Sequence, residues 1–251
     1  CLLVRVQRGT EKHTILFDTG YNNMGVLHNM DKLAVDPDEM EAIVLSHAHM
    51  DHTGSLHAIV EKMSDPIPLV VHPDAFQYPR FLEQKDGSLK RLPRTLVRSD
   101  LDPRNVKILE SRTPTSIVDH LILVTGEVER TTAFEKGMLN ALIEMDGKLK
   151  PDPIKDDQAL VMKLKQKGLV VISGCSHAGI INTVLYAKKL TGVEKVYAVL
   201  GGFHLSGADY EKILEDLEKT FIELIEEKKN IHIIKNKYLN IYPELNYIPQ
   251  N

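Results

Sequence analysis

The chain has 251 residues, of which 43% are hydrophobic and 26% are charged, and its formal net charge is −4. These values are ordinary for a single globular domain of this length, and the negative charge argues against a general nucleic-acid-binding protein, which usually carries a basic face. No apolar run approaches the roughly 20 residues that span a membrane, and two distant cysteines make no disulfide framework, so we expect a cytoplasmic protein with neither nucleic-acid nor membrane partners.

The first 72 residues or so alternate between apolar runs and turns. The chain begins at Cys1 inside an apolar strand without an initiator Met, so we expect N-terminal residues of the native protein to be missing. A second strand precedes a turn at Asp18-Thr19-Gly20, and residues 42–45 have the composition of a buried strand. Apolar positions with helical spacing follow at 56–63, and residues 69–71 predict another short strand.

The strand at 42–45 is followed by His47-Ala48-His49-Met50-Asp51-His52, which places four metal-binding side chains in six residues. Alternate side chains of an extended segment share one side, so His47 and His49 can bind one ion. Where the chain turns into the helix, Asp51 and His52 are redirected and can serve a second ion. Imidazole and carboxylate groups favour zinc, iron or manganese. A solvated loop is a weaker interpretation, because chance rarely gathers three His and one Asp in six residues at the end of a strand. A structural zinc site is also weaker, because such sites are usually rich in cysteine and the chain has no C-x-x-C pair.

Between residues 73 and 153 the periodicity weakens, because prolines interrupt it, and only short strand-like pieces such as 117–124 remain. We interpret this range as an insertion or lid over the site. A basic stretch inside it is expected to be a solvated loop face, with contact to an anionic substrate as the alternative. Its members are Lys90, Arg91, Arg94, Arg98 and Arg104.

The alternation sharpens after Pro153. Residues 160–162 and 169–172 predict two adjacent strands joined by a hairpin at Lys167-Gly168. Residues 180–190 predict a helix, and 196–200 predict a buried strand that ends at Gly201-Gly202-Phe203-His204. An amphipathic helix is predicted over 208–229.

Three motifs in this order resemble the metallo-β-lactamase-like superfamily, whose signature is H-x-H-x-D-H after a buried strand. In chain order they are the strand and turn at 15–20, the six-residue motif, and the strand at 170–177 that ends in His177. The resemblance implies a four-layer αβ/βα sandwich with metals at one edge of the sheets. It also implies that His47, His49 and His177 bind one metal and that Asp51 and His52 bind the other.

The same resemblance suggests two divalent ions, with zinc favoured and manganese or iron as alternatives, because redox members with iron often have Glu where this chain has His49. Asp51 is the candidate catalytic group, which would orient an activated water and take a proton. His204 is expected to be either a ligand of the second metal or a substrate contact. The final histidine of the family is not evident, since His232 lies within an apolar run and is expected to be buried.

Two further residues have alternative roles. Asp18 either accepts a hydrogen bond from a ligand imidazole, which would fix its tautomer, or caps its own turn. Cys175 is expected to be a small buried residue rather than a thiolate ligand.

Four segments narrow the resemblance to a subgroup. They are 125–130, 156–160, 174–179 and 201–205, and they are similar to the subgroup of the dihydropterin–ribofuranosylaminobenzene phosphate synthase of methanopterin biosynthesis. The resemblance implies a transferase that displaces diphosphate from a pterin, hence a small, phosphate-bearing substrate, with Asp157 and Arg130 as candidate substrate-binding residues. The alternatives are a metal-dependent hydrolase of an ester, lactone or phosphodiester, and a protein with a decayed metal site.

Overall fold

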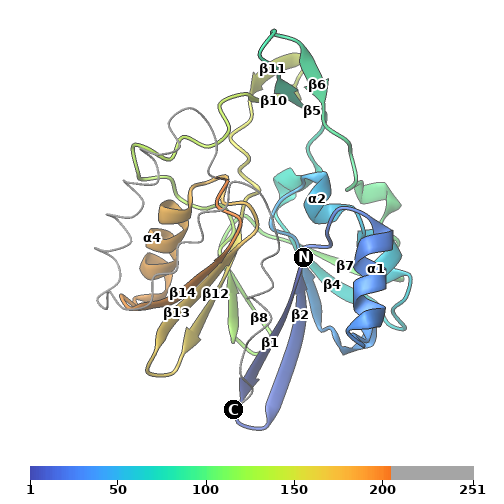
Figure 1. The fold of residues 1–251 in the computed structure, drawn as a ribbon, viewed down its shortest axis with the longest axis vertical. Helices are drawn as coiled ribbons and strands as arrows, with labels where there is room; N and C mark the ends of the chain where they lie inside the picture. The colour runs from blue at the N-terminus through green and yellow to red at the C-terminus, as the bar shows by residue number, and fades with distance from the viewer. Residues whose placement is uncertain (205–251) are drawn as a thin grey trace.

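The computed structural model describes residues 1–204, in which two five-stranded sheets face each other with helices on their outer sides (Figure 1). In the first sheet β2, β3, β4 and β7 are parallel, and β1 pairs with β2 as an antiparallel hairpin. Its strands, in spatial order, are β1 (Leu2–Arg8), β2 (Glu11–Phe17), β3 (Ala42–Val44), β4 (Ile67–Val71) and β7 (Val106–Glu110).

The second sheet contains the hairpin that was predicted around residue 167, with β12 and β13 antiparallel and in register from Ala159↔Ser173 to Leu164↔Gly168. Strand β14 joins β13 in parallel, as expected for strands connected by a helix. In spatial order the strands are β14 (Val196–Gly201), β13 (Gly168–Ser173), β12 (Ala159–Leu164), β9 (Ile122–Val124) and β8 (Thr115–Ile117).

Alternation along the strands separates the layers. Ile15 and Phe17 pack between the two sheets, whereas Leu16, which points the other way, packs on the helical side. In the second sheet Leu160 faces the first sheet and Val161 faces the outer side, where Ala187 of the long helix packs. The predicted four-layer αβ/βα sandwich is therefore confirmed.

The helices cover the outer faces of both sheets. Helices α1 (Asn23–Lys32), α2 (Met50–Thr53) and α3 (Leu56–Val60) belong to the first half, and α4 (Ile180–Thr191) covers the second sheet (Figure 1). Three short 3-10 turns, η1 (Pro37–Glu39), η2 (Pro73–Phe76) and η3 (Arg98–Asp100), lie in the connections. None of the helices within residues 1–204 is long and apolar enough to cross a bilayer.

A third, smaller sheet stands apart from the sandwich, at the top of Figure 1. It consists of β11 (Lys148–Pro151), β10 (Ala141–Met145), β5 (Arg80–Glu83) and β6 (Leu89–Arg91), in that order. The range 73–153 therefore does not form one separate unit. Strands β7, β8 and β9 extend the two main sheets, where Val106, Ile122 and Val124 are buried.

Helix α1 was not predicted. Its apolar residues are few, and Met30 is its one buried side chain, while the Asn22 side chain caps it by accepting a hydrogen bond from Gly25 N at 3.1 Å. The helix predicted over 208–229 and His232 lie outside the described residues.

Candidate metal centre

The predicted site residues meet at one edge of the sandwich because several strands end there. Strands β2 and β3 are parallel, so Asp18 and His47 follow their carboxyl ends at the same edge. The carboxyl end of β13 leads to His177 from the opposite sheet. Strand β12 runs antiparallel to β13, so the residues that precede it, 156–158, also lie at this edge. Chain topology thus brings together segments from both halves.

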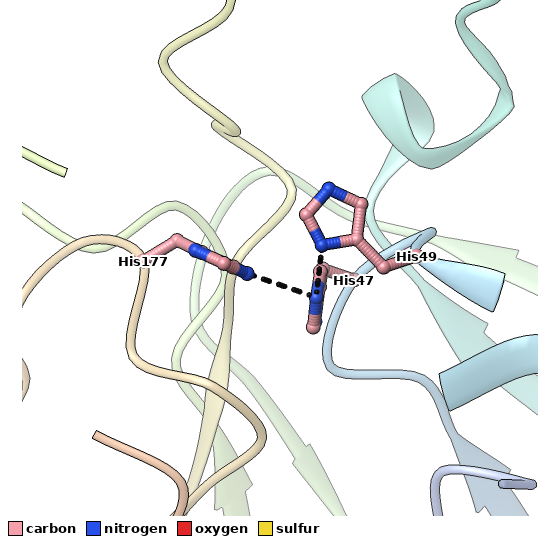
Figure 2. A group of neighbouring side chains, drawn as sticks. All are labelled: His47, His49 and His177. Carbon is pink, nitrogen blue, oxygen red and sulfur yellow. Dashed lines mark hydrogen bonds between the residues drawn. The ribbon is translucent and has the colours of Figure 1, made fainter. Parts of the chain in front are cut away.

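Three imidazoles form a cluster between the two sheets (Figure 2). The Nε2 atom of His47 lies 3.0 Å from His49 Nδ1 and 3.2 Å from His177 Nε2. His47 and His177 are buried, and His49 is half-buried at the cavity. One nitrogen from each ring lies within 4.8 Å of the others, which is a spacing that a single metal ion can bridge. The three histidines that the resemblance assigns to one metal therefore converge.

Burial keeps these imidazoles neutral at pH 7. It lowers the pKa of His47 well below its usual value, the pKa of His49 to about 4 and the pKa of His177 to about 2. Neighbouring histidines lower the pKa of His47 and His177 further. A neutral imidazole is the form that binds metals, so burial prepares the cluster for a cation.

Asp18 orients two of the histidines. Its Oδ2 atom lies 2.6 Å from His52 Nδ1 and accepts a hydrogen bond from the Ser46 hydroxyl at 2.8 Å, while its Oδ1 accepts from Ser46 N at 2.7 Å. Because the Ser46 hydroxyl donates to Asp18, its oxygen accepts from His47 Nδ1, at 2.9 Å. The Nε2 atom of His47 is therefore left with a free lone pair, and Nε2 of His52 is the nitrogen that a metal can take in place of a proton. Of the two roles considered for Asp18, the structure shows the contact with an imidazole.

A second group of donors surrounds His52. Its Nε2 lies 3.5 Å from Asp51 Oδ2 and 3.1 Å from Cys175 Sγ. The hydrogen bond with His52 is the main reason why the pKa of Asp51 is lowered, to about 2. Burial lowers the pKa of His52, but hydrogen bonds with Asp18, Asp51 and Cys175 outweigh it and raise the pKa to about 12. The surroundings of Nε2 thus favour a positive charge, whether a proton or a metal.

Cys175 is placed differently from the expectation of a small buried residue. Its side chain is half-buried, and its sulfur faces His52 rather than a packed apolar core. Together with one nitrogen each of His47 and His52, the sulfur forms a second set of three ligand atoms within 4.8 Å of one another.

The remaining predicted residues have different surroundings. The His204 ring lies 4.6 Å from the His177 ring, centroid to centroid, and it lines the cavity. Asp157 is buried, its Oδ2 accepts a hydrogen bond from Ala178 N at 2.8 Å, and burial raises its pKa to about 7. Arg130 is exposed and donates to the Pro153 carbonyl. Neither Asp157 nor Arg130 lines the cavity beside the histidines.

That cavity, of about 220 Å³, opens directly above the imidazoles. Its floor includes His49, Asp51 and His177, and its walls come from residues 75–82 and 92–96. The wall residues are mainly apolar or aromatic, with two cationic side chains among them: Ala75, Tyr78, Arg80, Leu82, Leu92, Arg94 and Leu96. Arg94 belongs to the basic stretch that was expected to be a solvated face. It is exposed, but it also lines the cavity, 5.0 Å above the Tyr78 ring.

The sequence did not indicate a buried ion pair beneath the cavity. Arg80, which is 4% exposed, donates from Nη2 to Asp156 Oδ1 at 2.7 Å and lies 3.3 Å from Asp152 Oδ2. Asp156 Oδ2 also accepts from Ala48 N at 2.8 Å, inside the six-residue motif. The polar run at 156–158 was a signal for Asp156, but no local pattern marks Arg80, whose partner lies 76 positions away.

The donor set fits divalent cations. Three neutral imidazoles converge on one point, and a second set of ligand atoms, from His52 and Cys175, shares His47 with the first. The Asp51 carboxylate contacts His52 beside this second set. His177 Nδ1 is buried without a hydrogen-bond partner among the described residues, so Nε2 is the nitrogen directed at the cluster. Mixed nitrogen, oxygen and sulfur donors suit zinc and related ions rather than magnesium or calcium.

Comparison with known proteins agrees with this geometry. A family model described as the metallo-beta-lactamase superfamily matches residues 1–181. A relative from Methanocaldococcus jannaschii, named 7,8-dihydropterin-6-methyl-4-(β-D-ribofuranosyl)-aminobenzene-5'-phosphate synthase, is 35% identical over 219 residues, which cover 86% of this chain and 74% of that protein. An uncharacterized protein of the same organism is 34% identical over 77% of this chain and 68% of its own length.

A solved structure described as a metal-dependent hydrolase of the β-lactamase superfamily superposes with a TM-score of 0.65. It is 26% identical and covers 88% of this chain and 80% of its own.

Proposed function

The chain belongs to the metallo-β-lactamase superfamily, and we propose that it is an enzyme with two divalent metal ions that transfers a pterin-methyl group from its diphosphate to an aryl amine. The convergence of His47, His49 and His177 beside Asp51 and His52 carries the metal-dependent part of this proposal. The pterin part is supported by the 35% identical relative, whose name describes the product of such a transfer.

In this reaction a carbon–nitrogen bond forms between the amine and the pterin methylene carbon, and the carbon–oxygen bond to diphosphate breaks. Two metal ions would neutralise charge on the leaving diphosphate, as divalent ions do in phosphoryl chemistry. Asp51 lines the cavity and is ionised at neutral pH, and its place in the cavity makes its carboxylate our candidate acceptor for the proton that the amine loses.

The cavity walls support a flat, anionic substrate. Tyr78, Leu82 and Leu92 offer apolar and aromatic surface to a planar ring. The charge of Arg80 is offset by Asp152 and Asp156, whereas Arg94 reaches the wall from the exposed side. Arg94 is therefore the cation that we assign to the phosphate groups.

A coupled assay tests the proposal. The metal-loaded protein is mixed with a dihydropterin-methyl diphosphate, with and without an amino-benzene ribofuranosyl phosphate, and diphosphate release is followed. We expect release that depends on the amine, together with the joined product. Asp51→Asn should slow it about 100-fold or more, since it removes a proton acceptor. Release at the same rate without the amine would contradict a transferase.

A metal-dependent hydrolase is the second candidate. The 26% identical solved relative is described as a metal-dependent hydrolase, and the same donor groups activate water in many zinc enzymes. Diphosphate or ester cleavage without an acceptor amine would favour this alternative over the transferase.

A further inference from the structure

We propose that Cys175 supplies a thiolate ligand to the second metal ion, beside Asp51 and His52. The proposal rests on the two-metal centre proposed above and assigns one more donor to it. It departs from the sequence-based expectation that Cys175 only fills space.

The position of the sulfur relative to His52 is the first observation. His52 Nδ1 is engaged by Asp18 at 2.6 Å, so Nε2 is the nitrogen available to a metal, and that atom lies 3.1 Å from Cys175 Sγ. Asp51 Oδ2 lies 3.5 Å from the same nitrogen. One nitrogen each of His47 and His52 and the Cys175 sulfur lie within 4.8 Å of one another, and His52 and Cys175 come from segments 123 positions apart. Nitrogen and sulfur donors at this spacing bind zinc-like ions.

Two glycines allow Cys175 to lie this close to His52. A methyl group added at Gly174 would lie 2.1 Å from Ser46 Oγ, and one added at Gly202 would lie 2.6 Å from the Gly174 carbonyl oxygen. Gly202 N also donates to that carbonyl at 2.8 Å. Gly174, which directly precedes Cys175, is thus packed between Ser46, just before the six-residue motif, and Gly202, just after β14.

The end of β14 offers no donor side chain before His204. Gly201 ends the strand, and Gly202 and Phe203 follow it, so none of the three offers a ligand atom from its side chain. Cys175, at the end of the adjacent parallel strand, brings a negative charge to the same edge once its thiol has lost its proton to solvent on metal binding. A thiolate would make the second position softer than the histidine position and favour zinc over manganese there.

Cobalt(II) reconstitution tests the proposal, because a cobalt–thiolate bond gives a strong near-ultraviolet charge-transfer band. The full chain is freed of metal, titrated with Co²⁺, and followed by absorption and metal analysis. We expect the band to grow with the second equivalent. Cys175→Ser should abolish it and weaken the second site about tenfold or more, while the first site is retained. Cys1→Ser, which removes the other cysteine, an exposed one, is the matched control and should keep the band.

The outcomes separate the two proposals. Two bound cobalt ions without the band, or a band that survives in Cys175→Ser, would overturn the role of Cys175 and leave the two-metal centre standing. Fewer than two bound ions in the unsubstituted protein would overturn both.

If Cys175→Ser does not fold, thiol alkylation of the unsubstituted protein gives a second measurement. Bound metal should protect Cys175 and not Cys1 from iodoacetamide, and a chelator should remove that protection. Equal alkylation of Cys175 with and without metal would overturn its role as a ligand.

Discussion

His47 and His177 are 130 positions apart in the chain, yet their Nε2 atoms lie 3.2 Å apart in a buried setting. Two neutral imidazoles gain little from such an approach by themselves, because burial costs each ring its hydration. A shared cation offsets that cost, since it binds the lone pairs of all three rings. The Ser46 hydroxyl donates to Asp18 and accepts from His47 Nδ1. These two hydrogen bonds leave Nε2 as the free nitrogen of His47.

His49→Ala should remove most of the bound metal. The substitution removes one of three nitrogens at the first position, and a tetrahedral site with two protein donors binds a metal far more weakly. We expect about two metal equivalents per chain in the unsubstituted protein by elemental analysis, and one or fewer in the variant. His28→Ala, which removes an exposed histidine of α1, is the control and should retain both. Equal metal content in His49→Ala and the control would refute the assignment.

Asp156→Asn should destabilise the fold by about 2–3 kcal/mol, because it leaves the buried Arg80 guanidinium with Asp152 as its remaining carboxylate partner. The cost is measured by urea unfolding. Asp102→Asn is the control, since it breaks a pair with Arg104, whose side chain is 87% exposed, and it should leave the unfolding midpoint nearly unchanged. A similar midpoint for both variants would show that the buried pair contributes little.

Some of the site residues could be predicted from the sequence, and others could not. The motif at 47–52 is readable because four donors lie close in sequence, and His177 because it follows an apolar strand. Arg80 could not be predicted, since its pairing with Asp156 depends on how a strand of the small sheet is placed over the sandwich. The substrate role of Arg130 stays a prediction, since its guanidinium donates to the Pro153 carbonyl and does not line the cavity.

At the scale of secondary-structure elements, the centre depends on how closely the loop after β13 packs against the loop after β3. Gly174 lies at that contact, and the side chain of any larger residue at this position would collide with Ser46. The segment that precedes β12 completes the junction. Asp156 accepts from Ala48 N, Gln158 donates to Leu45 O, and Asp157 accepts from Ala178 N. The segment 156–158 is thus hydrogen-bonded to both the loop after β3 and the loop after β13, which carry the histidines.

Gly174→Ala should disturb this junction. Overpacking of this kind costs about 1–3 kcal/mol, and here the displaced neighbour is Ser46, which orients His47. We expect a lower urea midpoint and weaker metal retention. Gly25→Ala is the matched control, because the nearest atom to its new methyl group would be 3.7 Å away, within a helix that favours alanine. A Gly174→Ala protein with unchanged metal content and midpoint would contradict the account of this contact.

Local patterns predicted the long strands and the β12–β13 hairpin, because alternation and a tight turn each depend on residues that are consecutive in the sequence. They did not reveal that β7 pairs with β4 or that β9 pairs with β12, since these pairings join segments far apart in sequence. Prolines around these short strands also hid their periodicity. The result was one predicted insertion where the structure has extensions of both main sheets and a smaller third sheet.

For the whole molecule, the two halves of the sandwich contribute to one centre across their shared core. The first half supplies His47, His49 and His52, and the second supplies Cys175 and His177. Ile15, Phe17 and Val44 of one sheet pack against Ile122, Leu160 and Ile172 of the other below the site. Metal ions that bind ligands from both halves would therefore stabilise this interface.

Removal of the metals should lower the thermal midpoint, because the ions bind the native arrangement and not the unfolded chain. With free metal near 100 times its dissociation constant, each ion should raise the midpoint by roughly 5–10 °C for a protein of this size, so the loss of two ions should lower it by roughly 10–20 °C. Differential scanning calorimetry with and without a chelator measures it. His177→Ala, which removes a ligand of the first position only, should show a clearly smaller difference between the two conditions. A chelator that strips the metal without moving the midpoint of the unsubstituted protein would contradict a centre shared by the two halves.

Anomalous diffraction from crystals of the metal-loaded protein, collected at the absorption edge of the bound metal, locates the ions directly. We predict two peaks at the edge of the sandwich, one within bonding distance of His47, His49 and His177, and the other within bonding distance of Asp51 and His52. Peaks bound by the residues of one half alone, or no peak between the histidines of the two halves, would contradict the account.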